Sequence, residues 1–130
     1  MIDPCQIIAR KMLEDGYDPK PVLDFINEAT ITGQCEIVDI GKSIFVLIYI
    51  APYEIVLHLF SEDSPVVLRK KILIFHNKIL ERSISKVYIY GENPKLIELL
   101  RKLGFTLQIS DKSKFDWMID PKCEILHINI

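Results

Sequence analysis

Two ionisable side chains stand at positions where a proton acceptor could act at neutral pH. His58 follows the apolar run "EIVL", and an imidazole has an ordinary pKa of about 6.5. Glu92 lies directly before Asn93, between a predicted strand and a predicted helix. Each has a structural alternative, because a histidine on a buried strand is commonly a satisfied core residue and a carboxylate before a helix stabilises the helix start. We take His58 and Glu92 as the candidate catalytic bases.

Three consecutive basic residues could contribute to an anion site. Arg69, Lys70 and Lys71 fall one turn inside a helix predicted over 65–82. The start of a helix offers unpaired N–H groups and positive potential to an anion, and basic side chains nearby would add to both. A solvated helix face is the simpler account of such a group.

Other chemistries lack their residue patterns. The three histidines and three cysteines never occur at the close spacing of metal ligands, so we predict no metal site. The chain has no P-loop, no Gly-x-Ser-x-Gly and no Gly-x-Gly-x-x-Gly, the usual signals of NTPase, hydrolase and dinucleotide chemistry. Cysteines that are odd in number and far apart indicate buried thiols in a reducing compartment rather than a disulfide framework.

Length and composition are those of one ordinary globular domain. The chain has 130 residues, of which 49% are hydrophobic and 26% charged. We expect a single domain over 1–130, with a helical pair in 1–32, a β-meander in 33–60 and helices alternating with strands in 61–130. The formal charge of −2 and the dispersed basic residues argue against a nucleic-acid-binding surface.

Two stretches bear on location. The N-terminal "MIDPCQIIARKML" has an acid and a proline early and no continuous apolar core, which argues against a signal peptide. The longest apolar run, "SIFVLIYIAPYEIVLHLF", is β-branched and is broken by Pro52 and Glu54, which favours paired buried strands over a membrane helix. We therefore expect a cytoplasmic protein with no membrane partner.

Apolar periodicity and helix-boundary residues predict the order α-α-β-β-β-α-β-α-β-β. An antiparallel meander with its second and third strands in mid-sheet should be followed by strand–helix–strand units, giving an α/β (α+β) fold with a mixed sheet and helices on both faces. The predicted helices cover 4–15, 18–30, 65–82 and 94–103, and the first four strands cover 35–40, 44–50, 54–60 and 86–90.

The pairing of the last three strand-like segments is open. "FTLQIS" and "FDWMI" would form a hairpin across "SDKSK", or the tail "CEILHINI" would be the partner instead. If the tail strand stays unpaired, its free edge would join two copies into a homodimer.

The stretch "YGENPKLIELLRKLGF" links strand 86–90 to the last predicted helix. Asn93 as N-cap, Pro94 in the first turn and Gly104 after the end are good helix-boundary chemistry in any protein. The same spacing, an Asn after a strand and Gly-Phe eleven residues later (Gly104 and Phe105), resembles the GNAT family of Gcn5-related N-acetyltransferases. With the order of elements, the resemblance covers most of 33–130, and the strand that opens the family's sheet has no obvious counterpart.

This resemblance implies transfer of an acetyl group from acetyl-CoA to an amine, which we cannot identify from the chain. The reaction would lie where strands 54–60 and 86–90 part, beside His58. The residues expected to hold the cofactor are Leu59, Phe60, Ser61, Val66, Val67, Arg69, Lys70 and Asn93.

The chain departs from the family's pattern at two points. The segment over 60–71 has no glycine where the family has a Gly-rich phosphate loop, and Glu62 and Asp63 place negative charge there. Where many members have a proton-donating Tyr seven residues after the Asn, this chain has Leu100, although Tyr88 and Tyr90 lie on the adjacent strand. The alternative is a catalytically inactive binding or assembly protein that does not use acetyl-CoA.

Overall fold

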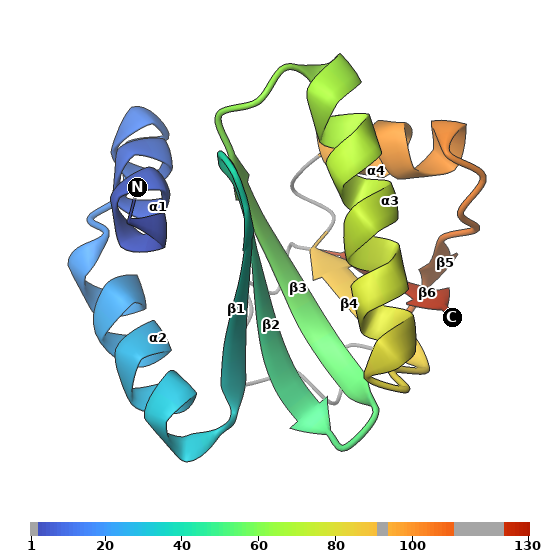
Figure 1. The fold of residues 1–130 in the computed structure, drawn as a ribbon, viewed down its shortest axis with the longest axis horizontal. Coiled ribbons are helices and arrows are strands. Elements are labelled where there is room, and N and C mark those ends of the chain that lie inside the picture. Colours follow the sequence, from blue (N-terminus) through green and yellow to red (C-terminus); the bar gives the residue numbers. More distant parts are fainter. Residues whose placement is uncertain (1–2, 91–93, 111–123) are drawn as a thin grey trace.

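The computed structural model describes residues 3–90, 94–110 and 124–130, and its elements follow the predicted order. One sheet carries helices on both faces, so the predicted fold class is confirmed (Figure 1). Among the described residues, no helix has the length and apolar character that crossing a membrane requires. The helices are α1 Pro4–Glu14, α2 Lys20–Thr32, α3 Pro65–Glu81 and α4 Pro94–Lys102, and the strands are β1 Cys35–Ile40, β2 Ser43–Ala51, β3 Glu54–Ser61, β4 Lys86–Tyr90, β5 Gln108–Ile109 and β6 Ile125–Asn129.

The six-stranded sheet has the order β1-β2-β3-β4-β6-β5 and separates two apolar cores. Helices α1 and α2 cover one face, whereas α3 and α4 cover the other (Figure 1). Strand β2 is buried on both faces because successive side chains enter opposite cores, with Phe45 on the α3 side and Val46 on the α1 side. The predicted mid-sheet position of the second and third strands is therefore confirmed.

The helix starts are set by side-chain caps. The Asp3 carboxylate accepts from the Cys5 N–H at 2.9 Å, as expected for α1, and the Ser64 hydroxyl caps α3. Helix α2 begins at Lys20, two residues later than predicted, after a turn in which the Asp18 carboxylate accepts from the Lys20 N–H at 3.0 Å. These side-chain caps fix where α1 and α3 begin.

The C-terminal strand lies inside the sheet. Strand β6 pairs antiparallel with β4 over five residues and with β5 over Gln108 and Ile109. The expectation of an unpaired tail edge is therefore wrong, and the alternative in which the tail pairs with "FTLQIS" is confirmed. The physical reason is hydrogen bonding on both sides: β4 and β5 pair with the two edges of β6, and Ile125, Leu126 and Ile128 are buried. The predicted strand over 115–119 falls outside the described residues.

Strands β3 and β4 are parallel neighbours that part along their length. They pair over three positions, from Glu54 with Lys86 to Val56 with Tyr88. Beyond that point β3 continues to Ser61 along β2, and β4 continues to Tyr90 along β6. The carboxyl ends of the two strands consequently diverge, which is where open α/β sheets bind ligands.

An ion pair fastens the C-terminal end of α3 to strand β1. The guanidinium of Arg82 donates to both carboxylate oxygens of Glu36, with Nε 2.9 Å from Oε1, and also donates to the Lys78 carbonyl. The Tyr49 hydroxyl adds a 3.1 Å hydrogen bond to the same carboxylate. Hydrogen bonds from Arg82 hold the pKa of Glu36 below its ordinary value.

We expect Glu36→Gln to lower the free energy of unfolding by about 1 kcal/mol at pH 7, because a partly exposed bidentate pair is lost. Since the folded-state pKa lies below the ordinary 4.5, this stability is present above pH 4.5 and is lost as the pH falls through the folded value. Urea unfolding at pH 7 and at pH 3 should show a difference between the two proteins that shrinks at pH 3.

Tyr49→Phe is the matched control, because it removes one hydrogen bond to Glu36 and leaves the ion pair with Arg82. Equal stability of Glu36→Gln and wild type at pH 7 would contradict a stabilising role for the pair.

Candidate functional site

The candidate site is the opening between the carboxyl ends of β3 and β4. At the start of the strands the pair is closed by the Tyr88 hydroxyl, which donates to Glu54 at 2.8 Å. Burial first, and then the Glu54 carboxylate, raise the pKa of Tyr88 to about 12, so the phenol stays protonated and keeps this bond at all ordinary pH values. The strands are thus fastened at one end and parted at the other.

His58 stands at the beginning of the opening, on the face covered by α1. It lies opposite Val46 of β2, and its ring packs against Tyr90 with centroids 5.0 Å apart and planes tilted by 58°. The backbone pairing of β3 with β4 has ended by this point, and the contact between the two rings takes its place. The structure therefore brings His58, the predicted base, together with Tyr90 where β3 and β4 part.

His58 is neutral at physiological pH. Its side chain keeps some solvent exposure, yet the apolar side chains crowded around it make the charged form costly, and this desolvation lowers the pKa of His58 to about 4. A neutral imidazole is free to accept a proton, although a base of this pKa binds the proton weakly. At neutral pH the imidazole of His58 is therefore unprotonated and only weakly basic.

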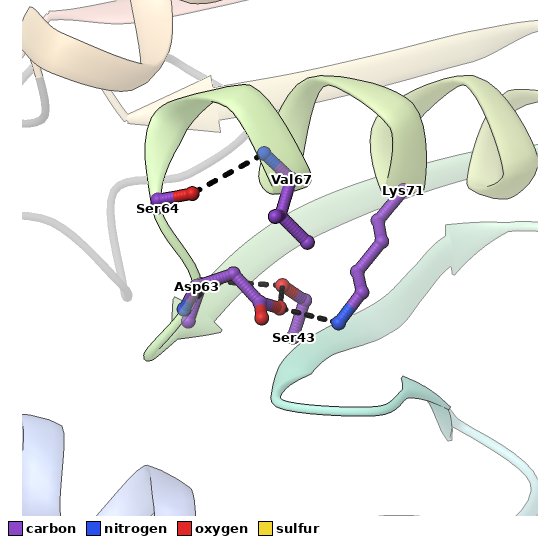
Figure 2. A network of polar contacts seen from close by, with 6 residues as sticks. Ser43, Asp63, Ser64, Val67 and Lys71 are labelled. Carbon is purple, nitrogen blue, oxygen red and sulfur yellow. Dashed lines mark hydrogen bonds and ion pairs between the residues drawn. The ribbon is translucent and has the colours of Figure 1, made fainter.

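The start of α3 is held by a buried polar network, which Figure 2 shows from close by. The Asp63 carboxylate accepts from the Ser43 hydroxyl at 2.6 Å and from the Lys71 ammonium. The Ser61 hydroxyl lies 2.7 Å from that of Ser43, which is fully buried, and accepts from the Asp63 N–H. The network ties the end of β3 to the start of β2 and to the second turn of α3.

The turn between β1 and β2 fits closely over this network. Gly41 has a φ of +63°, and a Cβ added there would lie 2.8 Å from the Lys71 ammonium nitrogen. The left-handed backbone favours glycine here, and a Cβ would make the Lys71 side chain shift from its position against Asp63. Lys71, which sequence analysis assigned to a possible anion site, is committed to Asp63 instead.

The other acidic residue before α3 is also neutralised. Glu62 accepts from the Arg10 guanidinium of α1 at 2.7 Å. The negative charge that Glu62 and Asp63 place at this helix start is offset, because each carboxylate is paired with a cation of its own. What remains at the surface is the positive charge of Arg69 and Lys70, both exposed on α3.

Several N–H groups at the start of α3 are already used. The Val67 N–H donates to the Ser64 hydroxyl at 3.4 Å, the Leu68 N–H donates to the Ser64 carbonyl, and Pro65 has no N–H. In the part of the chain that the structure describes, the N–H groups of Ser64 and Val66 have no recorded bond and are the donors left for a ligand. An anion would find a smaller set of donors here than at a glycine-rich helix start.

The remaining predicted site residues divide between the two faces of β3 and the surface of α3. Leu59 packs on the α3 side and Phe60 on the α1 side, while Val66 and Val67 are exposed at the first turn of α3. Glu92 and Asn93 lie outside the described residues. Leu100 is buried in the core, so no tyrosine hydroxyl enters from this position of α4.

The predicted closure of α4 at Gly104 and Phe105 forms. Gly104 adopts a left-handed φ of 95°, and the Phe105 N–H returns to the Leu100 carbonyl at 3.1 Å. The Phe105 ring then meets His76 of α3 edge-on with centroids 5.1 Å apart. Gly-Phe in this chain therefore joins α4 to α3, which is a packing role.

The contact between Tyr90 and His58 is not among the predicted interactions. The alternation of "KVYIY" places Tyr88 and Tyr90 on one face of β4, and the resemblance already placed this strand beside 54–60, but the register that brings Tyr90 to His58 could not be predicted from the sequence. A cavity of about 330 Å³ elsewhere, beside α4 and lined by Glu98, Arg101 and Glu124 among others, contains no predicted site residue.

Solved acetyltransferases share this architecture. A spermidine N-acetyltransferase chimera from Vibrio cholerae and hSSAT superimposes with a TM-score of 0.63 at 12% identity, covering 98% of this chain and 92% of its own. A Bacillus subtilis acetyltransferase in complex with CoA gives a TM-score of 0.57 at 15% identity, covering 85% of each chain.

A ribosomal-protein-alanine N-acetyltransferase from Brucella melitensis gives a TM-score of 0.54 at 13% identity, covering 87% of this chain and 79% of its own. The chain has the GNAT fold. Neither a family model nor a curated protein sequence matches it. At these identities the likeness shows the fold alone, and the GNAT chemistry has to be argued from the residues in the opening.

We expect Asp63→Asn to destabilise this GNAT-fold protein by about 2 kcal/mol, because Asn keeps a hydrogen bond to Ser43 but leaves the Lys71 ammonium without its counter-charge. Burial alone would raise the pKa of Asp63, yet Lys71 and Ser43 together lower it below the ordinary 3.8. The contribution is therefore present above pH 3.8 and is lost as the pH falls through the folded value.

Calorimetric unfolding at pH 7 and pH 3 measures this difference. Glu62→Gln is the control, since its Arg10 partner is half-exposed and the pair should contribute less than 1 kcal/mol. An equal loss in both variants would contradict a special role for the buried network.

Proposed function

We propose that this protein is an acetyl-CoA-dependent N-acetyltransferase acting on an amine of a small molecule or peptide. The observation that carries the proposal is the opening between β3 and β4. It begins after Val56 and Tyr88, and the neutral His58 stands where it begins. Strand backbone that lacks a neighbour can bind an extended ligand by adding it to the sheet, and the pantetheine arm of CoA is such a ligand.

The residues present fit this co-substrate in part. The diverging halves of β3 and β4, including Leu59 and Phe60, would hold the arm. The N–H groups of Ser64 and Val66, with the exposed Arg69 and Lys70, would hold the phosphates, since the nearby carboxylates are paired with other cations. The absence of glycine at this helix start favours modest affinity.

His58 would accept the proton of the attacking amine. Acetyl transfer forms the new bond between the amine nitrogen and the acetyl carbonyl carbon, and breaks the bond between that carbon and the CoA sulfur. The amine proton passes to His58, and the thiolate leaves as the thiol once it takes a proton. Tyr90, whose ring lies against His58, is the nearest phenol on β4 and is proposed as the proton source in place of Leu100.

The alternative function is a GNAT-fold binding or assembly protein without acetyl-CoA chemistry. Three observations favour it: the buried Leu100, the reduced set of N–H donors at α3, and the weak basicity of His58. Both functions use the same fold, so ligand binding distinguishes them.

We expect acetyl-CoA and free CoA to bind with micromolar affinity in calorimetric titration, and the affinity to fall as salt is raised, because phosphate contacts with Arg69 and Lys70 are screened. Arg69→Ala with Lys70→Ala should weaken CoA binding about tenfold, whereas Lys95→Ala on α4 should not. No heat and no thermal shift at millimolar ligand would leave the binding or assembly function.

We expect His58→Gln to lower kcat roughly 100-fold with little change in the Kd for acetyl-CoA, because it removes the proton acceptor and leaves the opening intact. Since the pKa of His58 is about 4, the acid limb of wild-type kcat/KM that belongs to this group should lie near pH 4 rather than pH 6.5. A wild-type rate for His58→Gln removes this residue from the mechanism.

Stability gives an independent measurement on His58. A folded pKa below the unfolded value means that the unfolded chain binds more protons, so wild-type stability falls as the pH drops from 6.5 toward 4. His58→Gln should lack that part of the pH dependence. An unchanged pH dependence in the variant would contradict the neutral, desolvated imidazole.

A further inference from the structure

An apolar cavity of about 30 Å³ lies between the sheet and the helices α3 and α4. Its walls come from β3, β4 and both helices, and no polar atom of the described residues faces it. Water entering this cavity would find no hydrogen-bond partner, so the cavity stays dry. One water-sized group requires about 10–15 Å³, so there is room for about two such groups, which corresponds to two carbons of an aliphatic chain.

The cavity lies directly behind the opening between β3 and β4. Leu57 and Leu59 of β3 and Ile89 of β4 line it. All three follow Val56 and Tyr88, the last residues that the two strands pair, so they border the part of the strands that has no shared ladder. Their side chains pack on the α3 side of the sheet. A group in the opening is therefore separated from the cavity by these aliphatic side chains alone.

The two sides of the opening differ in chemistry. Successive side chains of a strand alternate between faces, so His58 and Tyr90 lie on the α1 side, where their rings are in contact. On the α3 side, Leu100 of α4 forms part of the helix wall of the cavity. A tyrosine at this position would bring a hydroxyl to the wall, whereas leucine keeps it apolar. The α1 side suits proton transfer, and the α3 side suits a hydrocarbon.

The direction of attack turns the acyl chain toward the cavity. This step rests on the proposed function, in which His58 accepts the proton of an amine that attacks from the α1 side. As the carbonyl carbon becomes tetrahedral, its other three substituents bend away from the attacking nitrogen, toward the α3 side. The chain of the acyl group is one of the three, and the methyl group of an acetyl leaves the two carbons' worth of space behind it empty.

We propose that the preferred acyl donor carries a short aliphatic chain, so that propionyl-CoA and butyryl-CoA are better donors than acetyl-CoA. The new bond joins the amine nitrogen to the acyl carbonyl carbon, and the bond between that carbon and the CoA sulfur breaks. The amine proton goes to His58, and the sulfur leaves as the thiol after taking a proton from Tyr90. Each carbon beyond the length of acetyl fills part of the cavity, and burying one CH₂ favours binding about fourfold.

The test is calorimetric titration of the full chain with acetyl-, propionyl-, butyryl-, pentanoyl- and hexanoyl-CoA, which requires no acceptor amine. The Kd should fall about fourfold with each carbon from acetyl to butyryl, because each carbon leaves water for the cavity. It should rise again for pentanoyl- and hexanoyl-CoA, whose chains exceed the space available.

Two variants change the size of the cavity in opposite directions. Val87→Ile adds one carbon to its β4 wall and should reduce the preference for butyryl-CoA over acetyl-CoA about fourfold. Leu100→Val removes one carbon from the helix wall and should move the tightest binding to pentanoyl-CoA. Val38→Ile is the matched control, since Val38 is buried in the same core on β1 and does not line the cavity. This control should keep the wild-type preference.

Thermal unfolding tests the cavity without any ligand. Val87→Ile fills part of the empty space and should raise the Tm by about 2 °C. Val38→Ile adds the same carbon where the core has no such space and should not raise the Tm. A lower Tm for Val87→Ile than for Val38→Ile would mean that the space behind the opening is closed, and would overturn the proposal.

The titrations separate failure of this proposal from failure of the proposed function. Binding of acetyl-CoA as tight as that of butyryl-CoA contradicts the chain-length preference and leaves acetyl transfer standing. A preference for butyryl-CoA that is unchanged in both Val87→Ile and Leu100→Val puts the chain elsewhere, which also overturns the proposal. No binding of any of these acyl-CoA compounds at millimolar concentration contradicts the chain-length preference and the acyltransferase function together.

Discussion

The parallel pairing of β3 with β4 ends after three positions, and the position of the site depends on that short ladder. The cause lies on both strands. The end of β3 is held to β2 through Ser61 and Ser43, and to α3 through Asp63 and Lys71. Strand β4 is held over its whole length by β6. Each strand follows its outer neighbour, so their carboxyl ends separate and the rings of His58 and Tyr90 occupy the gap.

The electrostatics of the α3 start follow from the same network. An acidic pair before a helix would ordinarily act on the helix dipole and on any anion nearby. Here the Asp63 carboxylate pairs with Lys71 below the β1–β2 turn, and the Glu62 carboxylate pairs with Arg10 of α1. Both negative charges are therefore offset by tertiary ion pairs. The cost is that Lys71 no longer serves a ligand. Negative repulsion and the charge of Lys71 are removed together, which leaves the exposed positive charges of Arg69 and Lys70 in the first turns of α3.

Much of the fold could be predicted from the sequence because its signals are local. Asp3 and Ser64 cap their helices, and the β-branched run from Ile44 reads as a strand in isolation. The pairing of the tail could not be predicted, because "CEILHINI" has the same pattern at an edge as in mid-sheet. The interaction of His58 with Tyr90 was hidden for a related reason: 32 positions separate them, and only the β3–β4 register brings them together.

The ion-pair partners of Glu62 and Asp63 could not be predicted from the sequence either. Glu62 and Asp63 are adjacent to a helix start in the sequence, and the expected repulsion was sound for side chains in that place. Arg10 is 52 positions from Glu62, and the buried Ser43 is 20 positions from Asp63. Local sequence gives the charge of a residue, whereas its counter-charge comes from the tertiary fold.

The two edges of the sheet, β1 and β5, differ in how they are formed. The C-terminal strand β6 pairs on both sides, so the edge beyond β4 is closed by the short strand β5. At the other end of the sheet β1 has β2 as its one strand neighbour among the described residues, and α2 packs on one of its faces. A ligand opening in mid-sheet needs rigid strands on either side of it. On the side that carries His58 that rigidity comes from the uninterrupted β1–β2 ladder and the Glu36–Arg82 ion pair, and on the other side from the pairing of β4 with β6.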